Sequence, residues 1–279
     1  MIQKYGIVLI ALIAPLWAQS GAASDFASER LVQIASREAQ IYKRIAEDPD
    51  FYSADDLDRR INDLVQSYRT YLTENPEDVS ALVLYGKLLR RVQLKDEAFR
   101  AFLKADSLDP TLAVVKQQIG THLAETGKGK AALPFYFSAV ELEPETPEYH
   151  FALGQLLYAF HDEFIEESIF TAPALERETM KAFRKAVSLA PENFDFQMRL
   201  GEAYYDMISP DWRSALLHWK RMGDRFGHDA LRRQIIDLHR SNVLAKLGRY
   251  EEAKALAETI TEPNLQYSKQ QVIDAIAQH

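Results

Sequence analysis

The sequence predicts an all-α protein built as a stack of similar helix pairs. A block of residues 82–110 recurs after an interval of 34 residues as residues 119–144, and a third copy occupies residues 153–191. Inside each block, apolar residues return at spacings of three or four, which is typical of amphipathic helices. A unit this short cannot bury its apolar face alone, so neighbouring units are expected to stack and share a core.

The first half of each block predicts a helix that packs closely against a neighbour. Each block has a glycine beside an apolar residue at the same phase, at Gly86, Gly120, Gly154 and, further on, Gly201. Glycine inside a helix costs about 1 kcal/mol relative to alanine. Its return at one phase indicates that close helix packing offsets this cost.

The second half of each block predicts a helix with small residues and one aromatic residue on its inner face. These residues are Ala98, Phe102 and Ala105, then Ala132, Tyr136 and Ala139, then Phe183 and Ala186. A proline follows each helix, at Pro110, Pro144 and Pro191. Proline lacks an amide donor and disfavours the α conformation in the residue before it, so each second helix should end there.

Together these features resemble the tetratricopeptide repeat (TPR) family, whose members are arrays of antiparallel helix pairs. The resemblance implies a right-handed α-solenoid, the TPR superhelix. It is strongest over residues 79–191, which hold three units, and it extends more weakly over residues 192–279. A solenoid grows by adding units, so we expect one continuous array rather than separate globular domains.

The outer units depart from the family pattern. Residues 24–78 predict N-terminal helices that include a degenerate unit, with one helix over 29–46 and a second containing Leu64, Tyr68 and Tyr71. The fourth unit is carried by Leu200, Gly201, Tyr204, Ala215 and Trp219. In the fifth, Arg240 and Ser241 replace the expected leucine and glycine, so the pattern does not predict its first helix. A closing helix over 268–277 should cap the array.

The third unit contains an insertion. Gly154 and Gly201 are 47 residues apart, 13 more than the period, and the excess falls between the two helices at about 162–178. It carries the apolar residues Phe164, Ile165, Ile169, Phe170 and Leu175. These side chains either fold back on the array or contact a partner, and folding back is favoured because exposed apolar patches on soluble proteins are small.

Residues 1–23 have the layout of a secretory signal peptide. Lys4 precedes an apolar run over 7–17, and small or polar residues follow over 18–23, with cleavage sites after Ala18, Ala22 or Ala23. An uncleaved anchor is the alternative. The chain has no cysteine for lipidation or disulfides and no Asn-x-Ser/Thr acceptor, which favours a bacterial envelope. We therefore expect a periplasmic or secreted protein without a stable membrane anchor.

Charge and motifs exclude several classes of function. The formal net charge is −8 and no run of lysine or arginine occurs, which argues against nucleic-acid and anionic-lipid partners. Residues 127–130 contain two Gly-Lys pairs but lack the spacing and the Ser/Thr of a phosphate loop, so they predict a turn. His161 and the nearby carboxylates predict a solvated helix end in preference to a metal site. No catalytic motif is present, and we expect no enzyme activity, cofactor or metal.

The TPR resemblance implies that the first helix of each pair lines a concave groove for a peptide. The implied lining is Val83, Lys87, Arg90, Gln117, Thr121, Phe151, Gln155, Tyr158, Met198, Glu202 and Tyr205. This row is basic at Lys87 and Arg90 and acidic at Glu202. The family variant that grips a C-terminal carboxylate uses asparagines and lysines here, and this chain holds Lys87, Thr121, Gln155 and Glu202 at the matching positions, which argues against that mode. Tyr158 and Tyr205 could instead pack between helices.

These observations predict an exported, non-enzymatic scaffold that binds a polypeptide segment, from another envelope component, in its groove. One alternative is a structural accessory subunit of an envelope or polysaccharide-export assembly that uses its ends and convex face. A carbohydrate-binding helical protein or an enzyme, with groove aromatics stacked on sugar rings, is disfavoured because no paired carboxylates are recognisable.

Overall fold

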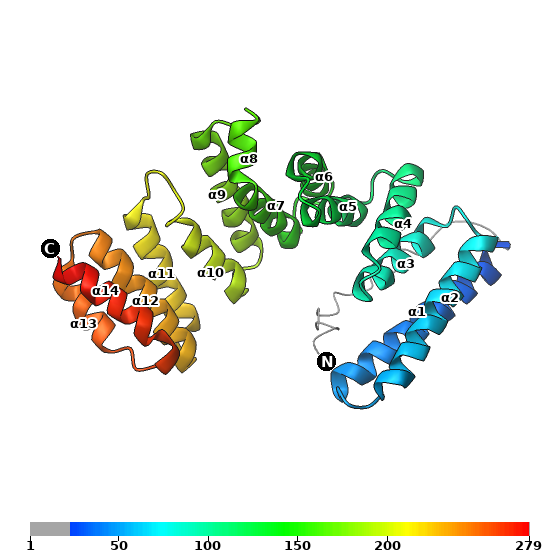
Figure 1. Cartoon of the computed structure of the whole chain (residues 1–279), viewed down its shortest axis with the longest axis horizontal. Coiled ribbons are helices and arrows are strands. Elements are labelled where there is room, and N and C mark those ends of the chain that lie inside the picture. Colours follow the sequence, from blue (N-terminus) through cyan, green and yellow to red (C-terminus); the bar gives the residue numbers. More distant parts are fainter. Residues whose placement is uncertain (1–22, 279) are drawn as a thin grey trace. The chain divides into compact units, whose positions relative to one another are not determined.

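The computed structural model describes residues 23–278, and this part of the chain is helical without any β-strand. The chain divides into two compact units, residues 1–142 and 143–279. Within each unit, consecutive helices fold back on one another as antiparallel pairs (Figure 1). The prediction of an all-α array of helix pairs is confirmed. The predicted signal peptide lies outside the described residues, apart from Ala23.

The first unit contains three helix pairs, α1 with α2, α3 with α4, and α5 with α6. Their bounds are α1 Ala23–Glu47, α2 Ala54–Glu74, α3 Val79–Arg91, α4 Lys95–Leu108, α5 Ala113–Glu125 and α6 Gly129–Leu142. The pair α1 and α2 is the predicted degenerate unit, and its Leu64, Tyr68 and Tyr71 are buried. The side chains of Ser53 and Asp78 accept hydrogen bonds at the N-termini of α2 and α3, which satisfies amides that have no partner inside the helix.

The second unit contains the pairs α7 with α9, α10 with α11, and α12 with α13, followed by α14. Their bounds are α7 Pro147–Ala159, α8 His161–Glu166, α9 Ala172–Leu189, α10 Phe194–Ala203, α11 Trp212–Phe226, α12 Ala230–Lys246, α13 Tyr250–Glu258 and α14 Gln266–Ala277, with a 3₁₀ turn at Pro263–Leu265. The helix α14 packs on both α12 and α13. It is the closing helix expected from the sequence.

The repeated glycines allow an aromatic ring of the second helix to contact the backbone of the first. A Cβ atom added at Gly86 would lie 2.7 Å from the Phe102 ring, and one at Gly120 would lie 2.8 Å from the Tyr136 ring. Gly201 has the same relationship with Trp219. These distances are too short for any side chain, so the close packing predicted from the glycine period is confirmed.

The prolines end the second helices as predicted. The helices α4, α6 and α9 end at Leu108, Leu142 and Leu189, each two residues before a proline. The turn between α5 and α6 contains Gly127 in the left-handed region, with φ of 73°. Residues 127–130 are therefore a turn followed by the first residues of α6.

The insertion in the third unit folds back on its own helix pair. Part of it forms the short helix α8, and the remainder extends the N-terminus of α9, so only residues 167–171 are not helical. Phe164 and Leu175 are fully buried, and Ile165, Ile169 and Phe170 are half-buried. The structure thus confirms folding back, and the inserted segment is more helical than the loop expected from the sequence.

The fifth unit has a regular first helix, which the sequence pattern did not predict. Ser241 occupies the position of the repeated glycine, is fully buried, and donates a hydrogen bond from Oγ to the carbonyl of Ala253 at 2.6 Å. The position of the large aromatic ring is taken by Ala257, which is also fully buried. Because a methyl group replaces the ring, α12 can carry a side chain where the other units need glycine.

Candidate functional site

The predicted binding row lies on the first helices of both units, and its members differ in how much they are engaged within the protein. In the first unit, Val83 is buried, with 8% of its surface exposed, so its side chain belongs to the core. Lys87 is exposed on α3. The remaining residues of this unit are half-buried: Arg90 is ion-paired with α5, and Gln117 and Thr121 are hydrogen-bonded mainly within α5.

Lys87 lies near an acidic residue of α1. The Glu38 carboxylate accepts hydrogen bonds from Arg91 Nη1 at 3.2 Å and from the Tyr68 hydroxyl at 3.0 Å. Burial raises the pKa of Glu38, and the charges of Arg91 and Lys87 act in the opposite direction. The positive end of the predicted row is therefore partly neutralised by an acid of the same unit.

Arg90 is also paired internally. Its Nη2 lies 2.8 Å from Glu125 Oε1 on α5, and Lys95 Nζ lies 3.0 Å from the other oxygen of the same carboxylate. Burial acts to raise the pKa of Glu125, but the hydrogen bonds from Arg90 and Lys95 outweigh it and lower the pKa. This ion-pair cluster connects α3 with α5. The charge of Arg90, predicted to contact a ligand, is therefore paired within the protein.

The amide and hydroxyl groups of α5 are bonded to one another. Gln117 Nε2 donates to Thr121 Oγ1 at 3.1 Å, and Thr121 Oγ1 lies 3.2 Å from the Tyr136 hydroxyl. Gln118 donates to the Gln117 side-chain oxygen at 2.7 Å. Within the first unit, the row thus offers few unpaired polar groups to a ligand.

The second unit presents a more open surface on α7. Tyr158 is 47% exposed, and the Arg199 guanidinium of α10 lies 4.1 Å from its ring centroid. Arg199 also pairs with Asp206 at 3.3 Å, which holds the guanidinium over the ring. Gln155 is exposed one helical turn before Tyr158, on the same face of α7. These residues form a surface platform on the first helices.

The other predicted residues of the second unit contribute mainly to packing. Phe151 stacks on Phe196 with ring centroids 4.3 Å apart, and Met198 packs against the core of this unit. Glu202 is half-buried on α10. The structure therefore brings Tyr158 together with Arg199, a residue that the sequence analysis did not select.

Tyr205 lies among aromatic side chains just after α10. Its ring centroid lies 5.6 Å from that of Trp212 and 5.8 Å from that of His239, and its hydroxyl is 3.3 Å from His239 Nδ1. Burial raises the pKa of Tyr205. The His239 ring in turn stacks on Trp219 at 4.2 Å, and burial lowers the pKa of His239 to about 4. Tyr205 is thus packed between helices.

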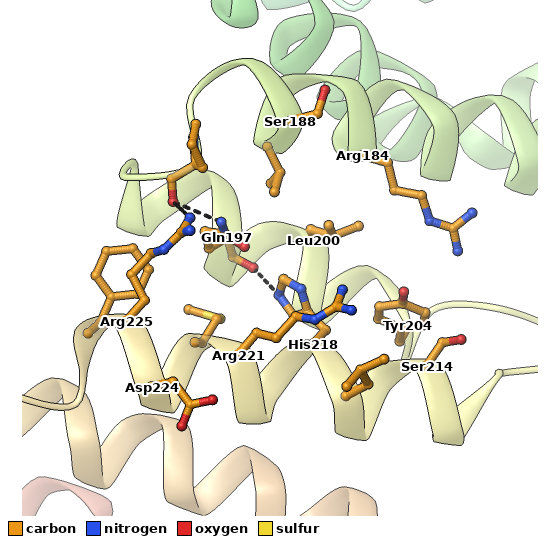
Figure 2. A pocket seen from close by; sticks show the side chains of 15 residues that line it. Arg184, Ser188, Gln197, Leu200, Tyr204, Ser214, His218, Arg221, Asp224 and Arg225 are labelled. Atoms are coloured by element: carbon orange, nitrogen blue, oxygen red, sulfur yellow. Dashed lines mark hydrogen bonds between the residues drawn. The ribbon is translucent and has the colours of Figure 1, made fainter.

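The second unit also contains a cavity of about 930 Å³ between α9, α10 and α11 (Figure 2). None of the site residues predicted from the sequence lines it. Its polar lining includes Arg184 from α9, Gln197 from α10, and His218, Arg221 and Arg225 from α11. The signal that could have found it is the sequence of α11, where arginines and a lysine recur every few residues without forming a run.

Residues 23–278 lack the features of a metal centre or a membrane span. No group of three or more histidine, aspartate or glutamate side chains in this part of the chain could hold a metal ion. His161 Nδ1 lies 3.0 Å from the Asp162 carboxylate at the start of α8. None of the described helices is both long and apolar enough to cross a membrane.

Comparisons with known proteins identify the fold. No family model and no curated protein matches the chain. Among solved structures, YrrB, a TPR protein with an unusual peptide-binding site, aligns with a TM-score of 0.56 and 14% identity, covering 75% of this chain and 93% of YrrB. The fold is that of a TPR array.

Structures of the protein MamA have the same fold. One MamA structure aligns with a TM-score of 0.52 and 16% identity over 73% of this chain and 95% of its own. Residues 41 to the end of MamA from Desulfovibrio magneticus RS-1 align with a TM-score of 0.51 and 17% identity, over 71% and 97%. At these identities the likeness concerns the TPR fold.

Proposed function

We propose that this chain is a non-enzymatic interaction scaffold that binds a polypeptide segment along the first helices of its TPR array. The observation that carries the proposal is the Tyr158 ring, which is 47% exposed and held under the Arg199 guanidinium. Tyrosine and arginine, together with tryptophan, are enriched among the residues that dominate binding at protein interfaces. The similarity to YrrB, a TPR protein with a peptide-binding site, supports a ligand of the same class.

The platform favours an extended segment with an apolar side chain. The open face of Tyr158 gives such a side chain a rigid surface, at a low cost in conformational entropy because tyrosine has only two side-chain torsions. Gln155, one turn away, offers an amide donor and an amide acceptor to the ligand backbone. Since Lys87 and Arg90 are compensated by Glu38 and Glu125, recognition of a free C-terminal carboxylate is not favoured.

Photo-crosslinking in the native cell tests the proposal. A photoreactive phenylalanine analogue at position 158 should crosslink to one recurring protein, identified by mass spectrometry. The matched control carries the same analogue at Tyr267 on α14, which is 76% exposed. The same set of crosslinked proteins from both positions, or none from position 158, would contradict a binding role for the platform.

Export is the second part of the proposal. It is supported by Lys4, the apolar run over 7–17 and the small residues that follow, all outside the described residues. A mature protein recovered from the envelope or the medium with its N-terminus at Gln19, Ala23 or Ser24 would match the expected cleavage sites. An intact N-terminus in the cytoplasmic fraction would exclude a periplasmic or secreted scaffold.

A second candidate function is that of a structural accessory subunit that uses the second helices. Its support is a set of exposed leucines on α4, α6 and α11, namely Leu103, Leu108, Leu142 and Leu217, each at least 39% exposed. Such side chains suit a permanent interface better than a transient one. Co-purification with a large assembly that survives Tyr158→Ala, and is lost on Leu103→Glu, would favour this function over peptide capture.

A further inference from the structure

We propose that the cavity between α9, α10 and α11 is a second binding site, and that its ligand is an acidic polypeptide segment with apolar side chains. The cavity has a volume of about 930 Å³, within the range of natural ligand sites. It lies wholly within the second unit. The proposal does not depend on the Tyr158 platform, because no residue of that platform lines the cavity.

The charge of the cavity is the first argument. Arg184 and Arg221 are exposed at its edge, and neither forms a salt bridge with any residue in the part of the chain that the structure describes. The chain as a whole has a formal net charge of −8, and its other basic groups include several, such as Arg90, that are already paired. Arg184 lies over the Tyr204 ring, 6.0 Å from its centroid, which leaves its N–H groups available to an acceptor. Two guanidinium groups without a salt bridge at one cavity attract carboxylates and can each bind one in a bidentate manner.

The acidic groups at the cavity do not cancel this charge. Among the described residues, Asp224 is the only carboxylate that lines the cavity, and Glu192 lies at the edge, 3.5 Å from Arg225 Nε. Arg225 is therefore partly compensated and is not counted among the ligand-binding groups. The pKa of Asp211, just before α11, is lowered mainly by hydrogen bonds and also by the charge of Arg184, but these two residues form no salt bridge. Arg184 and Arg221 project from two different helices toward the same opening (Figure 2).

The floor of the cavity is apolar. Leu200, Met222 and Phe226 are almost fully buried beneath it, and Leu217 on α11 is 48% exposed beside it. A ligand that carries only charge would leave the exposed side chain of Leu217 in contact with water. A segment that alternates acidic and apolar side chains would pair with the arginines and cover Leu217 as well, which adds the free energy of apolar burial.

The frame of the cavity is held by hydrogen bonds among its own residues. The Pro191 carbonyl accepts from Gln197 Nε2 at 2.9 Å and from Arg225 Nη1 at 2.8 Å, and the Gln197 carbonyl accepts from His218 Nε2 at 2.8 Å (Figure 2). Burial lowers the pKa of His218. His218 thus connects α11 to α10 by a hydrogen bond that does not require a charged ring, and the positive charge of the cavity comes from the arginines. A preformed site loses less conformational entropy on binding.

A polypeptide fits these features better than the other polyanions. Acidic polysaccharides bind through charge and through stacking on exposed rings, but the Tyr204 ring at this cavity is only 5% exposed. An anionic membrane is a flat partner, whereas the apolar residues here lie at the bottom of a hollow. Guanidinium groups without a salt bridge, next to the exposed Leu217 side chain and a recessed apolar floor, match the side chains of an extended acidic segment that also carries apolar residues.

Binding of labelled peptides to the purified mature chain tests the assignment. The probe is a fluorescein-labelled peptide of four Glu-Glu-Leu repeats, measured by fluorescence anisotropy at an ionic strength of about 0.15 M, where long-range attraction is screened. Two comparison peptides replace either every glutamate by glutamine or every leucine by glutamate. We expect the probe to bind about tenfold more tightly than either comparison peptide, since each lacks one of the two features recognised.

A matched pair of charge-reversal variants locates the site. Arg184→Glu with Arg221→Glu should weaken probe binding by about tenfold or more, as expected when charge-assisted pairs become repulsive. The control, Arg177→Glu with Arg213→Glu, makes the same change of charge on the same two helices at exposed residues that do not line the cavity. It should change probe binding by less than about twofold. Arg184→Gln with Arg221→Gln provides a milder version, and circular dichroism confirms the fold of each variant.

Several outcomes would overturn the proposal. Equal loss in both charge-reversal variants would mean general attraction to a basic surface, and absence of probe binding would mean that no such site exists. If polygalacturonate bound more tightly than the probe, and this binding were lost in Arg184→Glu with Arg221→Glu, the cavity would be assigned to an acidic polysaccharide. None of these results bears on crosslinking from position 158, so failure here is distinguishable from failure of the proposed scaffold function.

Discussion

Gly154 on α7 lies directly against the ring of Phe183 on α9, so that a Cβ atom at Gly154 would lie 2.6 Å from Phe183 Cε1. The same relationship joins Gly86 to Phe102 and Gly120 to Tyr136. In the third unit it persists although an inserted segment containing α8 separates the two residues in sequence. The insertion is therefore accommodated outside the contact that defines the helix pair.

Gly154→Ala is expected to lower the free energy of unfolding by about 1–3 kcal/mol. The methyl group overpacks against the Phe183 ring, and this cost exceeds the gain of about 1 kcal/mol in helix propensity. In a Phe183→Leu background the same substitution should cost less, because the ring that it contacts is absent. Urea denaturation of the four proteins of this double-mutant cycle measures the coupling.

Gln155→Ala controls for the alanine itself, since Gln155 is exposed on the same helix. It should change stability by less than about 0.5 kcal/mol. If Gly154→Ala cost as much in the Phe183→Leu background as with the native ring, the contact between the two residues would not explain the repeated glycine.

The fold could be predicted from the sequence because each unit repeats a physical constraint that involves few residues. The aromatic ring of each second helix leaves room only for glycine on the first helix, and a proline ends a helix because it lacks a backbone N–H. The fifth unit escaped prediction because two changes compensate each other, with Ser241 in place of glycine and Ala257 in place of the ring. Only the structure shows that Ser241 and Ala257 are both fully buried and that Ser241 donates a hydrogen bond to the helix that carries Ala257.

The binding residues were less predictable because their availability depends on partners elsewhere in the chain. The sequence presents Lys87 and Arg90 as available charges, yet Glu38 from α1 partly neutralises Lys87 and Glu125 from α5 pairs with Arg90. The cavity beside α11 escaped prediction for the opposite reason. Arg184 and Arg221 are inconspicuous in the sequence and become a pair only when α9 and α11 pack around α10.

Gln93→Gly is expected to stabilise the protein by about 0.5–1 kcal/mol. Gln93 has a φ of 66° in the turn between α3 and α4, one repeat before Gly127, which has a φ of 73°. The left-handed conformation costs a residue with a Cβ about 1–2 kcal/mol, and glycine avoids this cost while losing part of the gain to backbone entropy. Thermal and urea denaturation measure the change.

The reciprocal substitution Gly127→Ala should destabilise the protein by about 1 kcal/mol, although nothing lies within 4 Å of a Cβ atom there. Its effect therefore isolates backbone strain from packing. Stabilities of Gln93→Gly and the wild type that agree within error would indicate that the turn relaxes to accommodate glutamine without strain.

Tyr205→Ala is expected to lower stability by about 2–4 kcal/mol, whereas Tyr158→Ala should cost less than about 1 kcal/mol. Tyr205 is packed among Trp212 and His239, and its removal leaves a cavity. Tyr158 is 47% exposed, and its contact with Arg199 is a cation–π interaction of about 0.5–1 kcal/mol. Chemical denaturation separates the two roles. Equal costs would show that Tyr158 belongs to the core, and would weaken its assignment as a binding platform.

Stability is expected to fall in acid because of His239. Burial against Trp219 lowers the pKa of this histidine from 6.5 to about 4 in the folded state, whereas the unfolded chain retains the ordinary value. As pH falls below about 6.5, the unfolded state binds a proton that the folded state does not, so folding loses free energy until the pH reaches about 4. Between pH 7.5 and 5 this histidine should account for a loss of about 2 kcal/mol.

His239→Phe keeps a ring stacked on Trp219 and removes the titrating group, so its stability should decline less over this pH range, by about 2 kcal/mol. The Tyr205 hydroxyl retains the His239 backbone carbonyl, 3.3 Å away, as an acceptor in the variant. His228→Gln, at an exposed histidine, serves as the control and should follow the wild-type curve. Urea denaturation of the three proteins at pH 7.5, 6 and 5 provides the measurement. Parallel curves for the wild type and His239→Phe would mean that His239 takes up a proton in the folded state as readily as in the unfolded chain.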